Sequence, residues 1–339
     1  MTPDQITAHV LEQGDVRVTI LNLGAITHDW QVPDHSGTPV PVVLGHADWA
    51  DYLRYPGHYG TIEGRVANRI GGASFTLGGQ RYDLPANEGP NTLHGGPDGW
   101  CHRLWDLDPD GPRAAILRLR SAHGDQGLPG AVDVTVRIAL DGHRLSYHFD
   151  AIADRPTPIN LANHNYYALD GGQPVWGNQL RIAGSRITAL DGALIPTGDL
   201  PPVAGTKYDF RTMAQVDAAD PHHSGIDTNY ALDVTDAATP ALHMRAANGM
   251  AMRLWTDQPG LQVYTGHRVD PMGSALRGQR HGPGMGMAIE AQGFPDAVNH
   301  GHFPSVLCGP DRPYHQTTTV EIKPEAGGPD AGCPDAGGT

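Results

Sequence analysis

The chain has 339 residues, of which 39% are hydrophobic and 18% are charged, and its formal net charge is −14. A chain of this length can bury a sizeable core as one large β domain or as two ordinary domains. Its acidic balance argues against nucleic acid and anionic membranes as partners, because both are bound through basic patches.

The cysteines and the N-terminus narrow the class of protein further. Cys101, Cys308 and Cys333 lie far apart and show no C-x-x-C spacing, so neither a disulfide framework nor a thiolate zinc site is expected. Residues 1–5 lack the basic and apolar regions of a signal peptide, and no apolar run approaches the 18 residues or so of a membrane span. We therefore expect a soluble, cytoplasmic protein.

In chain order, the predicted elements are mostly strands. The first candidate covers residues 16–22. Residues 75–77, Gly78-Gly79 and residues 82–84 then predict a hairpin. Residues 132–138 alternate apolar and polar side chains, Asp141-Gly142 follows, and residues 145–149 alternate again. This pattern predicts a second hairpin, with a type I′ turn.

Further strands are expected at 114–120, 179–187, 251–255, 262–265 and 318–322, and only a weak helical pattern occurs, at 213–220. The 44 glycines and 29 prolines are spread along the whole chain, as suits short strands joined by tight turns. The sequence predicts an all-β fold, a large antiparallel β-sandwich, as a single domain over residues 1–323. Residues 324–339 contain little that could pack and are predicted to be a disordered tail.

Four polar clusters fall where a β protein has loops or strand ends: residues 64–70, 91–96, 160–167 and 288–297. Each has a plain structural alternative: a solvated arginine loop, an ordinary glycine turn, a polar edge strand and a lone surface glutamate. The third cluster is the least ordinary, since three asparagines and His164 lie within six residues. Their buried polar groups would need partners in a core strand.

Other chemistries find little support. The chain has 19 histidines, but His222-His223 and His300-x-His302 do not have the i, i+4 spacing of a helical metal site, so no metal is predicted. A G-x-S-x-G elbow, a Walker loop and a G-x-G-x-x-G fingerprint are all absent. No cofactor is expected.

Taken in order, the polar clusters and three further segments resemble the galactose mutarotase family of aldose 1-epimerases, over roughly residues 8–323. The segments are GRVANRI (64–70), NTLHGG (91–96), INLANHNYYAL (159–169), LIPTGDLPPVAGTKYDFR (194–211), GIDTNYAL (225–232), GLQVYTG (260–266) and IEAQGFPDAVNHGHFPSVL (289–307). The resemblance implies the family's supersandwich fold and a cofactor-free isomerase that interconverts the α and β anomers of a free aldohexose such as galactose or glucose. It also suggests a monomer or a homodimer.

The resemblance also implies roles for individual residues. Glu290 would be the general base and His164 the general acid, because ring opening takes a proton from O1 and delivers one to the ring oxygen O5. The residues expected to hold the sugar hydroxyls are Asn68, Arg69, His94, Asp227 and Gln262. We expect ionised Glu290 beside protonated His164, since opposite charges stabilise each other, and a contribution from Asp227 to the histidine's pKa if the two lie close.

Stacking of Tyr166 or Trp100 on the sugar's apolar face is a further expectation. Gly293 and the segment 270–287 depart from the family's pattern, and the choice of sugar is expected to lie there. Three alternatives stay open: an epimerase for another aldose, a non-catalytic sugar-binding or sensory module, and a hexose-phosphate epimerase. A hexose-phosphate epimerase would be expected to carry a His-Gly-Phe-Ala-Arg motif. This chain instead has His94-Gly95-Gly96, which speaks against that alternative.

Overall fold

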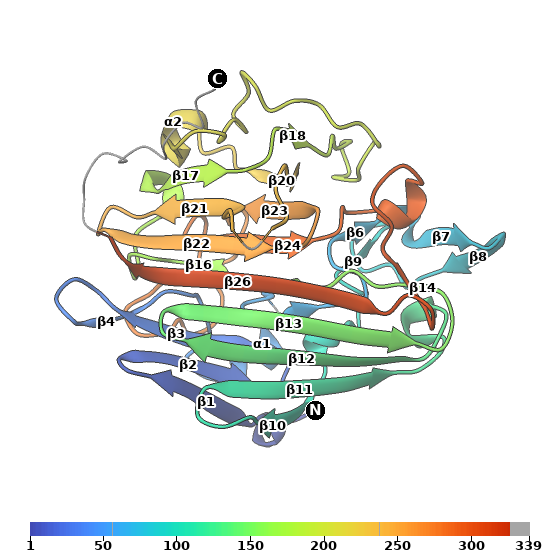
Figure 1. Ribbon diagram of the computed structural model, residues 1–339, viewed down its shortest axis with the longest axis horizontal. Coiled ribbons are helices and arrows are strands. Elements are labelled where there is room, and N and C mark those ends of the chain that lie inside the picture. Colours follow the sequence, from blue (N-terminus) through green and yellow to red (C-terminus); the bar gives the residue numbers. More distant parts are fainter. Residues whose placement is uncertain (56, 237, 326–339) are drawn as a thin grey trace.

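The computed structural model describes residues 1–55, 57–236 and 238–325. Antiparallel strands form two packed layers, and the strands of the front layer run side by side across the molecule (Figure 1). This layer is one nine-stranded sheet. Its strands, from edge to edge, are β10 (Asp106–Pro109), β11 (Ala114–Ser121), β12 (Val132–Asp141), β13 (Arg144–Ala153), β26 (Tyr314–Pro324), β22 (Met250–Thr256), β21 (Leu242–Arg245), β17 (Gln179–Ile182) and β19 (Ala214–Gln215).

The second layer is made of smaller sheets. A five-stranded sheet has the order β16 (Tyr166–Tyr167), β24 (Met287–Gln292), β23 (Gly260–Tyr264), β20 (Asp227–Ala231) and β18 (Arg186–Ile187). A four-stranded sheet has the order β1 (Ala8–Gln13), β2 (Val16–Leu21), β3 (Thr27–Pro33) and β4 (Pro39–Pro41).

Short elements complete the described part of the chain. Two-stranded pairs join β5 (Ile62–Glu63) to β15 (Ala162–Asn163), β6 (Arg69–Ile70) to β9 (Thr92–Leu93), β7 (Ser74–Leu77) to β8 (Gln80–Asp83) and β14 (Thr157–Pro158) to β25 (Leu307–Cys308). Each of the α-helices α1 (Asp51–Arg54) and α2 (Val216–Ala219) is a single turn. Short 3₁₀ turns lie at Pro3–Gln5, Gly71–Ala73, Trp100–His102, Asp125–Gly127, Val175–Gly177 and Ala297–Asn299.

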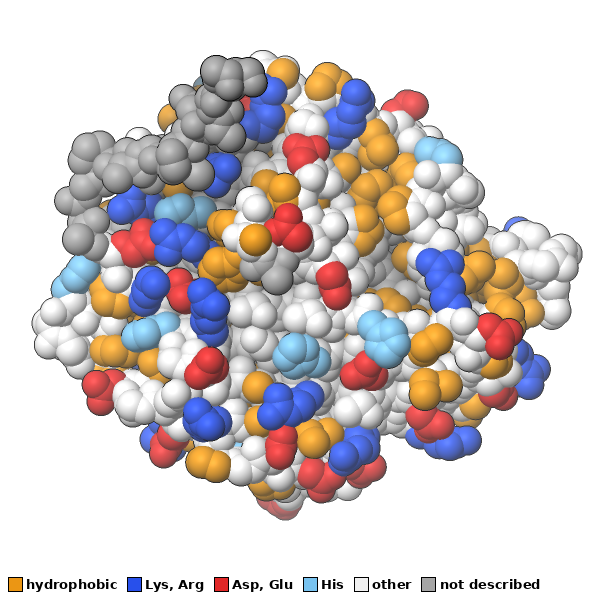
Figure 2. All heavy atoms as spheres, in the orientation of Figure 1, with side chains coloured by type: hydrophobic (Ala, Val, Ile, Leu, Met, Phe, Trp, Pro, Cys, Tyr) orange, Lys and Arg blue, Asp and Glu red, His pale blue; other side chains and the backbone are white. Residues whose placement is uncertain are grey.

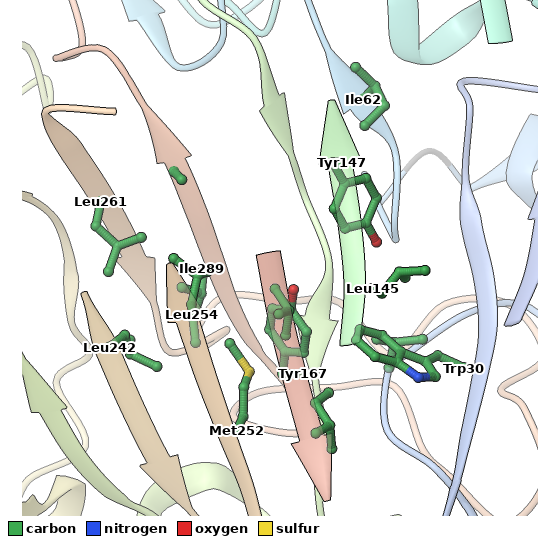
Figure 3. Packing of buried hydrophobic residues seen from close by; sticks show 14 of the residues in the cluster. Trp30, Ile62, Leu145, Tyr147, Tyr167, Leu242, Met252, Leu254, Leu261 and Ile289 are labelled. Atoms are coloured by element: carbon green, nitrogen blue, oxygen red, sulfur yellow. The ribbon is translucent and has the colours of Figure 1, made fainter. Parts of the chain in front are cut away.

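The main core lies between the nine-stranded and five-stranded sheets. Strand β12 alternates buried and more exposed residues along its whole length, as expected for a strand with one buried face. Figure 3 shows Leu261 and Ile289 of the five-stranded sheet close to Leu242 and Leu254 of the nine-stranded sheet. The outward face of the nine-stranded sheet instead carries interspersed charges of both signs (Figure 2), which include the ion pair between Arg144 and Glu321.

The all-β, antiparallel prediction is confirmed, and both predicted hairpins are present. In the first, Leu77 pairs with Gln80 across Gly78 and Gly79, which both have positive φ. In the second, Asp141 pairs with Arg144, so the central residues are Gly142 and His143 rather than Asp141 and Gly142. Positive φ occurs at Gly142 and not at His143, the pattern of a type II′ turn, so the type I′ prediction was wrong.

The predicted strand 179–187 is in fact two strands that belong to different layers. Its first half is β17 of the nine-stranded sheet and its second half is β18 of the five-stranded sheet. Gly184 lies between them, packed so closely on the next sheet that a Cβ there would lie 3.1 Å from the Cβ of Tyr230. A side-chain alternation cannot reveal this change of sheet, because both halves keep one buried face.

The C-terminal strand β26 ends at Pro324, one residue beyond the predicted end of the domain, and Glu325 still pairs with Arg245 and Arg253. Residues 326–339 of the predicted disordered tail lie outside the described residues. A single cluster of buried apolar residues extends from Leu11 to Ile322. Among the described helices, none is long and apolar enough to span a bilayer.

Candidate active site

The floor of the candidate site is the face of the five-stranded sheet that points away from the main core. Side chains alternate between the two faces of a strand, so every second residue of β24, β23 and β20 points to this side. Gln262 of β23 pairs directly with Glu290 of β24, and Asp227 of β20 pairs with Tyr264 of β23. The amide of Gln262 donates to Oδ1 of Asp227 at 2.7 Å. Register therefore brings residues far apart in the sequence together.

The walls come from short segments beside the sheet. His164 directly follows β15, His94 follows β9, and Asn68 precedes Arg69 at the start of β6. Asn68 and His94 both have positive φ, at 60° and 49°. The backbone N–H of Asn68 donates to Nδ1 of His94 at 3.2 Å, so in neutral His94 the proton is on Nε2, the nitrogen that can donate to a ligand.

Together the floor and walls enclose a cavity of about 240 Å³. All seven residues that the sequence predicted for the site line it: Asn68, Arg69, His94, His164, Asp227, Gln262 and Glu290. Tyr166, expected to stack on the sugar, also lines the cavity. Trp100 does not, because it packs in the main core against Trp105.

The two predicted catalytic side chains face each other. Nε2 of His164 lies 3.5 Å from Oε1 of Glu290, and both residues are buried. Burial, with the charges of Glu63 and Asp227, raises the pKa of Glu290 well above its ordinary value. Burial lowers the pKa of His164 to about 4. Both shifts favour the neutral forms, contrary to the expected ion pair, because desolvation by burial is the largest cause of each.

The carboxylate that acts on His164 is Glu63 rather than Asp227. The charge of Glu63 opposes the effect of burial on the pKa of His164, whereas Asp227 acts instead on Glu290. Glu63 is the last residue of β5 and is completely buried. Burial would raise its pKa, but attraction to His58 and His94 lowers it below the ordinary value.

Arg69 lines the cavity while its guanidinium is held from the side. Its Nε and Nη2 donate to the two carboxylate oxygens of Glu88 at 2.6 and 2.7 Å, a bidentate pair. This fixes the plane of the guanidinium. The arginine of the same motif that lies earlier in the chain, Arg65, is 2% exposed and donates to Ser121 and two backbone carbonyls, so its role is structural.

The asparagines of the third polar cluster are structural as well. Asn160 exchanges two hydrogen bonds with the backbone of Gly293, Asn163 donates to the carbonyl of Gly60, and Asn165 donates to the hydroxyl of Tyr147. These contacts give each buried amide nitrogen a partner, while Oδ1 of Asn165 has no hydrogen-bond partner among the described residues. A Cβ at Gly293 would lie 2.7 Å from a methyl of Val306, so packing accounts for this glycine.

Besides Tyr264 of the GLQVYTG segment, four further polar residues at the site were not predicted from the sequence: His58, Glu88 and Arg268, which line the cavity, and Glu63, which contacts His58. No motif marked them, although Glu63 directly precedes the GRVANRI segment. A second cavity of about 420 Å³ shares His58, Tyr166, Tyr264 and Arg268 with the first and is also lined by Asp270 and Met272. The beginning of the 270–287 segment therefore lies beside the candidate site.

Two groups of three potential metal ligands occur in the described chain: His58, Glu63 and Cys101, and His94, His164 and Glu290. At least one ligand atom of each group already hydrogen-bonds within the protein. His58 hydrogen-bonds to Glu63, and Nδ1 of His94 accepts from Asn68. The histidine pairs singled out in the sequence, 222–223 and 300/302, belong to neither group.

The fold and the cavity define a class of protein: a β-sandwich enzyme with a buried carboxyl–imidazole pair in a polar cavity lined by hydrogen-bonding side chains. The aldose 1-epimerase family model matches residues 7–321. Galactose mutarotase from Mus musculus is 36% identical over 313 residues, which cover 91% of each chain. Aldose 1-epimerase from Escherichia coli is 33% identical over 302 residues, which cover 86% of this chain and 87% of that protein.

Solved structures agree with this assignment. A homologue of the aldose epimerases from C. elegans superposes with a TM-score of 0.89 at 26% identity, over 94% of this chain and 99% of that one. The chain belongs to the aldose 1-epimerase family, and it is an isomerase acting on carbohydrates. The fold is the galactose mutarotase-like sandwich expected from the sequence.

Proposed function

We propose that this enzyme opens and closes the ring of a free aldohexose, such as galactose or glucose, with Glu290 as general base and His164 as general acid. The observation that carries the proposal is the contact between these two side chains: both are buried, they lie 3.5 Å apart, and they line one polar cavity. A neighbouring acid and base that reach O5 and O1, which are both bonded to C1, are sufficient, because the sugar itself supplies the aldehyde intermediate.

The reaction moves two protons. The Glu290 carboxylate takes the O1 proton, the bond between C1 and O5 breaks, and His164 delivers a proton to O5. Rotation about the C1–C2 bond exposes the other face of the aldehyde. Closure reverses both transfers, with O5 giving its proton back to His164 and Glu290 protonating O1. Each positioned proton transfer contributes about 10²- to 10⁴-fold in rate.

The directions of the two pKa shifts favour neutral His164 beside protonated Glu290, a pair that holds the single proton this chemistry requires. Neutral His164 beside protonated Glu290 has the same net charge as imidazolium beside carboxylate, so transfer between the two leaves the net charge of the cavity unchanged. Hydrogen bonds from the sugar hydroxyls to the carboxylate favour its ionised form. We propose that binding of the sugar moves the proton to His164.

The remaining predicted residues orient the sugar. Asp227 accepts from Gln262 through one oxygen, which leaves the other oxygen for a hydroxyl. His94 offers its Nε2–H, Asn68 its amide, and Arg69 the Nη1 end that faces away from Glu88. The hydrogen bonds of these side chains have fixed directions. Together the side chains therefore select a sugar by the arrangement of several hydroxyls rather than by one hydroxyl.

The test is polarimetry on fresh α-D-glucose, α-D-galactose and a panel of other aldoses, with wild type, Glu290→Gln and His164→Asn. Acceleration by wild type that both variants lose supports the proposal. If no aldose responds to wild type, the enzyme function fails and the sugar-binding module is favoured. If wild type is active and either variant retains its rate, the assignment of that residue fails.

We also propose that the enzyme works in the cytoplasm as a monomer or homodimer, as one domain over residues 1–323, and binds no nucleic acid. The charge of −14 argues against nucleic acid as a partner, and the core cluster that extends from Leu11 to Ile322 supports the single domain. Light scattering with size-exclusion chromatography tests the oligomeric state. A trimer or larger assembly would contradict it.

A further inference from the structure

The cavity carries a third histidine beside the two predicted ones. His58 lies in the loop before β5, and its ring centroid is 4.8 Å from that of His94 and 5.6 Å from that of His164. It lines the same cavity as Glu290. A sugar bound against His164 and Glu290 in this cavity would therefore lie within reach of the His58 ring.

Glu63 determines which nitrogen of His58 is free. Its Oε1 lies 3.0 Å from Nδ1 of His58 and also accepts a hydrogen bond from the hydroxyl of Thr61. An ionised carboxylate can only accept, so Nδ1 of His58 is the donor. The other ring nitrogen, Nε2, then points away from Glu63. Carboxylates orient functional imidazoles in this way in metal sites and catalytic triads.

The backbone holds His58 in an uncommon conformation. Its φ is +58°, in the left-handed region that is uncommon for residues other than glycine, although asparagine, aspartate and histidine adopt it more often than most. Asn68 and His94, two other residues of the cavity, share this conformation. Such a conformation persists only where surrounding contacts enforce it, and it is concentrated at functional sites.

We propose that His58 is a further substrate-contacting residue, which donates an Nε2 hydrogen bond to a sugar oxygen on the His164 side of the cavity, and that Glu63 is its positioning residue. This inference rests on the proposed function, since His164 marks the side of the ring oxygen. A charged donor there stabilises the negative charge that develops on oxygen as the C1–O5 bond breaks.

The charges around His58 favour its protonated form. Burial alone would lower the pKa of His58, but the charge of Glu63 and its hydrogen bond raise it above the ordinary value. Imidazolium at His58 in turn lowers the pKa of His164, which makes His164 the stronger acid. The other titratable groups close to His58 or lining its cavities are the amino group of Met1, Tyr52, Arg54, Tyr55, Tyr59, Arg69, Glu88, His94, Cys101, His102, Tyr166, Asp227, Tyr264, Arg268, Asp270 and Glu290.

The first test is His58→Asn, chosen because asparagine tolerates the left-handed conformation and lacks the ring. We expect kcat/KM to fall about 10- to 100-fold, as for loss of a hydrogen bond to a charged group. The matched control is His102→Asn. The His102 ring lies 6.2 Å from His58 but does not line the cavity of Glu290, so no change in kcat/KM is expected.

The second test separates positioning from structural support. Glu63→Gln keeps the shape of the side chain and removes its charge, so the pKa of His58 falls. The alkaline limb of the kcat/KM profile should then move about one pH unit or more to lower pH. In the double variant with His58→Asn, the Glu63→Gln change should move this limb less than it does in wild type, because only the direct effect of Glu63 on His164 remains.

Full kcat/KM in His58→Asn, or an unmoved alkaline limb in folded Glu63→Gln, overturns the inference. If Glu63→Gln does not fold, the result for His58→Asn and its control decides. The proposed function fails separately, when wild type accelerates no aldose or Glu290→Gln keeps its rate.

Discussion

Replacing Glu290 with glutamine separates what this residue does for catalysis from what it does for stability. The side chain is 2% exposed and lies on β24 opposite Gln262. Its Oε2 has no hydrogen-bond partner among the described residues. Glutamine has the same shape and no charge, so it fits the space but cannot accept the O1 proton.

The expected kinetic loss is that of a general base, about 10²- to 10⁴-fold in kcat, or about 2.7–5.4 kcal/mol of transition-state stabilisation. The stability of Glu290→Gln, by contrast, should exceed that of wild type at high pH. The folded pKa of Glu290 is raised by burial, so the unfolded chain releases this proton first as pH rises. The wild type therefore loses stability between the unfolded and the folded pKa, whereas the glutamine variant does not.

Two measurements check this reasoning: polarimetric rates with α-D-galactose, and Tm of both proteins at pH 4 and pH 8. We expect the Tm of Glu290→Gln relative to wild type to be higher at pH 8 than at pH 4. Glu12→Gln, the same change on a side chain that is 60% exposed, is the control and should alter neither quantity. Activity within tenfold of wild type, or a relative Tm that falls with pH, would refute the reasoning.

Three further predictions concern other parts of the site. His164→Asn should lower kcat about 10²- to 10⁴-fold with little change in KM, and a change confined to KM in steady-state rates would speak against an acid. Glu88→Gln frees the guanidinium of Arg69, so KM should rise up to about tenfold while kcat stays within about threefold; an unchanged KM would contradict this role. Gly95→Ala should lower the free energy of unfolding by about 1–3 kcal/mol or more, since φ is +84° and a Cβ would lie 1.9 Å from the carbonyl oxygen of Gly64. Gly177→Ala, with open space around its Cβ, is the control in chemical denaturation and should change stability little; equal losses would refute the steric argument.

Sequence patterns predicted strands well where each strand has one buried face. Strands β12 and β13 follow their alternation over ten residues each. The segment 179–187 shows the limit, because it crosses from one sheet to another at Gly184 without changing its pattern. The strands of the five-stranded sheet show another limit. All six residues of β24 are buried, because one face of this strand packs in the main core and the other faces the candidate site, so no alternation of buried and exposed residues marks the strand.

Motif order located seven cavity residues, but it could not locate the groups that set their charge. Glu63 looks like an ordinary strand residue, and its burial arises only when β5 pairs with β15 and the loop at His58 folds over it. Glu88 lies 19 residues from Arg69, in a segment with no motif. Glu63 and Glu88 both act through tertiary contacts with distant side chains, and no pattern in the neighbouring sequence marks either residue.

The contrast between the two buried carboxyls supports the assignment of the base. Glu63 and Glu290 are both almost inaccessible to solvent, yet the pKa of Glu63 is lowered and that of Glu290 is raised. The difference lies in their partners. Oε1 of Glu63 accepts from Thr61 and His58, which stabilise its charge, whereas Oε1 of Glu290 faces the cavity with Nε2 of His164 at 3.5 Å; Oε2 has no hydrogen-bond partner among the described residues in either case. Environments that push two carboxyl pKa values apart divide their roles. Glu63 is a fixed anion that tunes the histidines, and Glu290 is the carboxyl whose missing hydrogen bonds the sugar can supply, so its proton affinity changes when substrate binds.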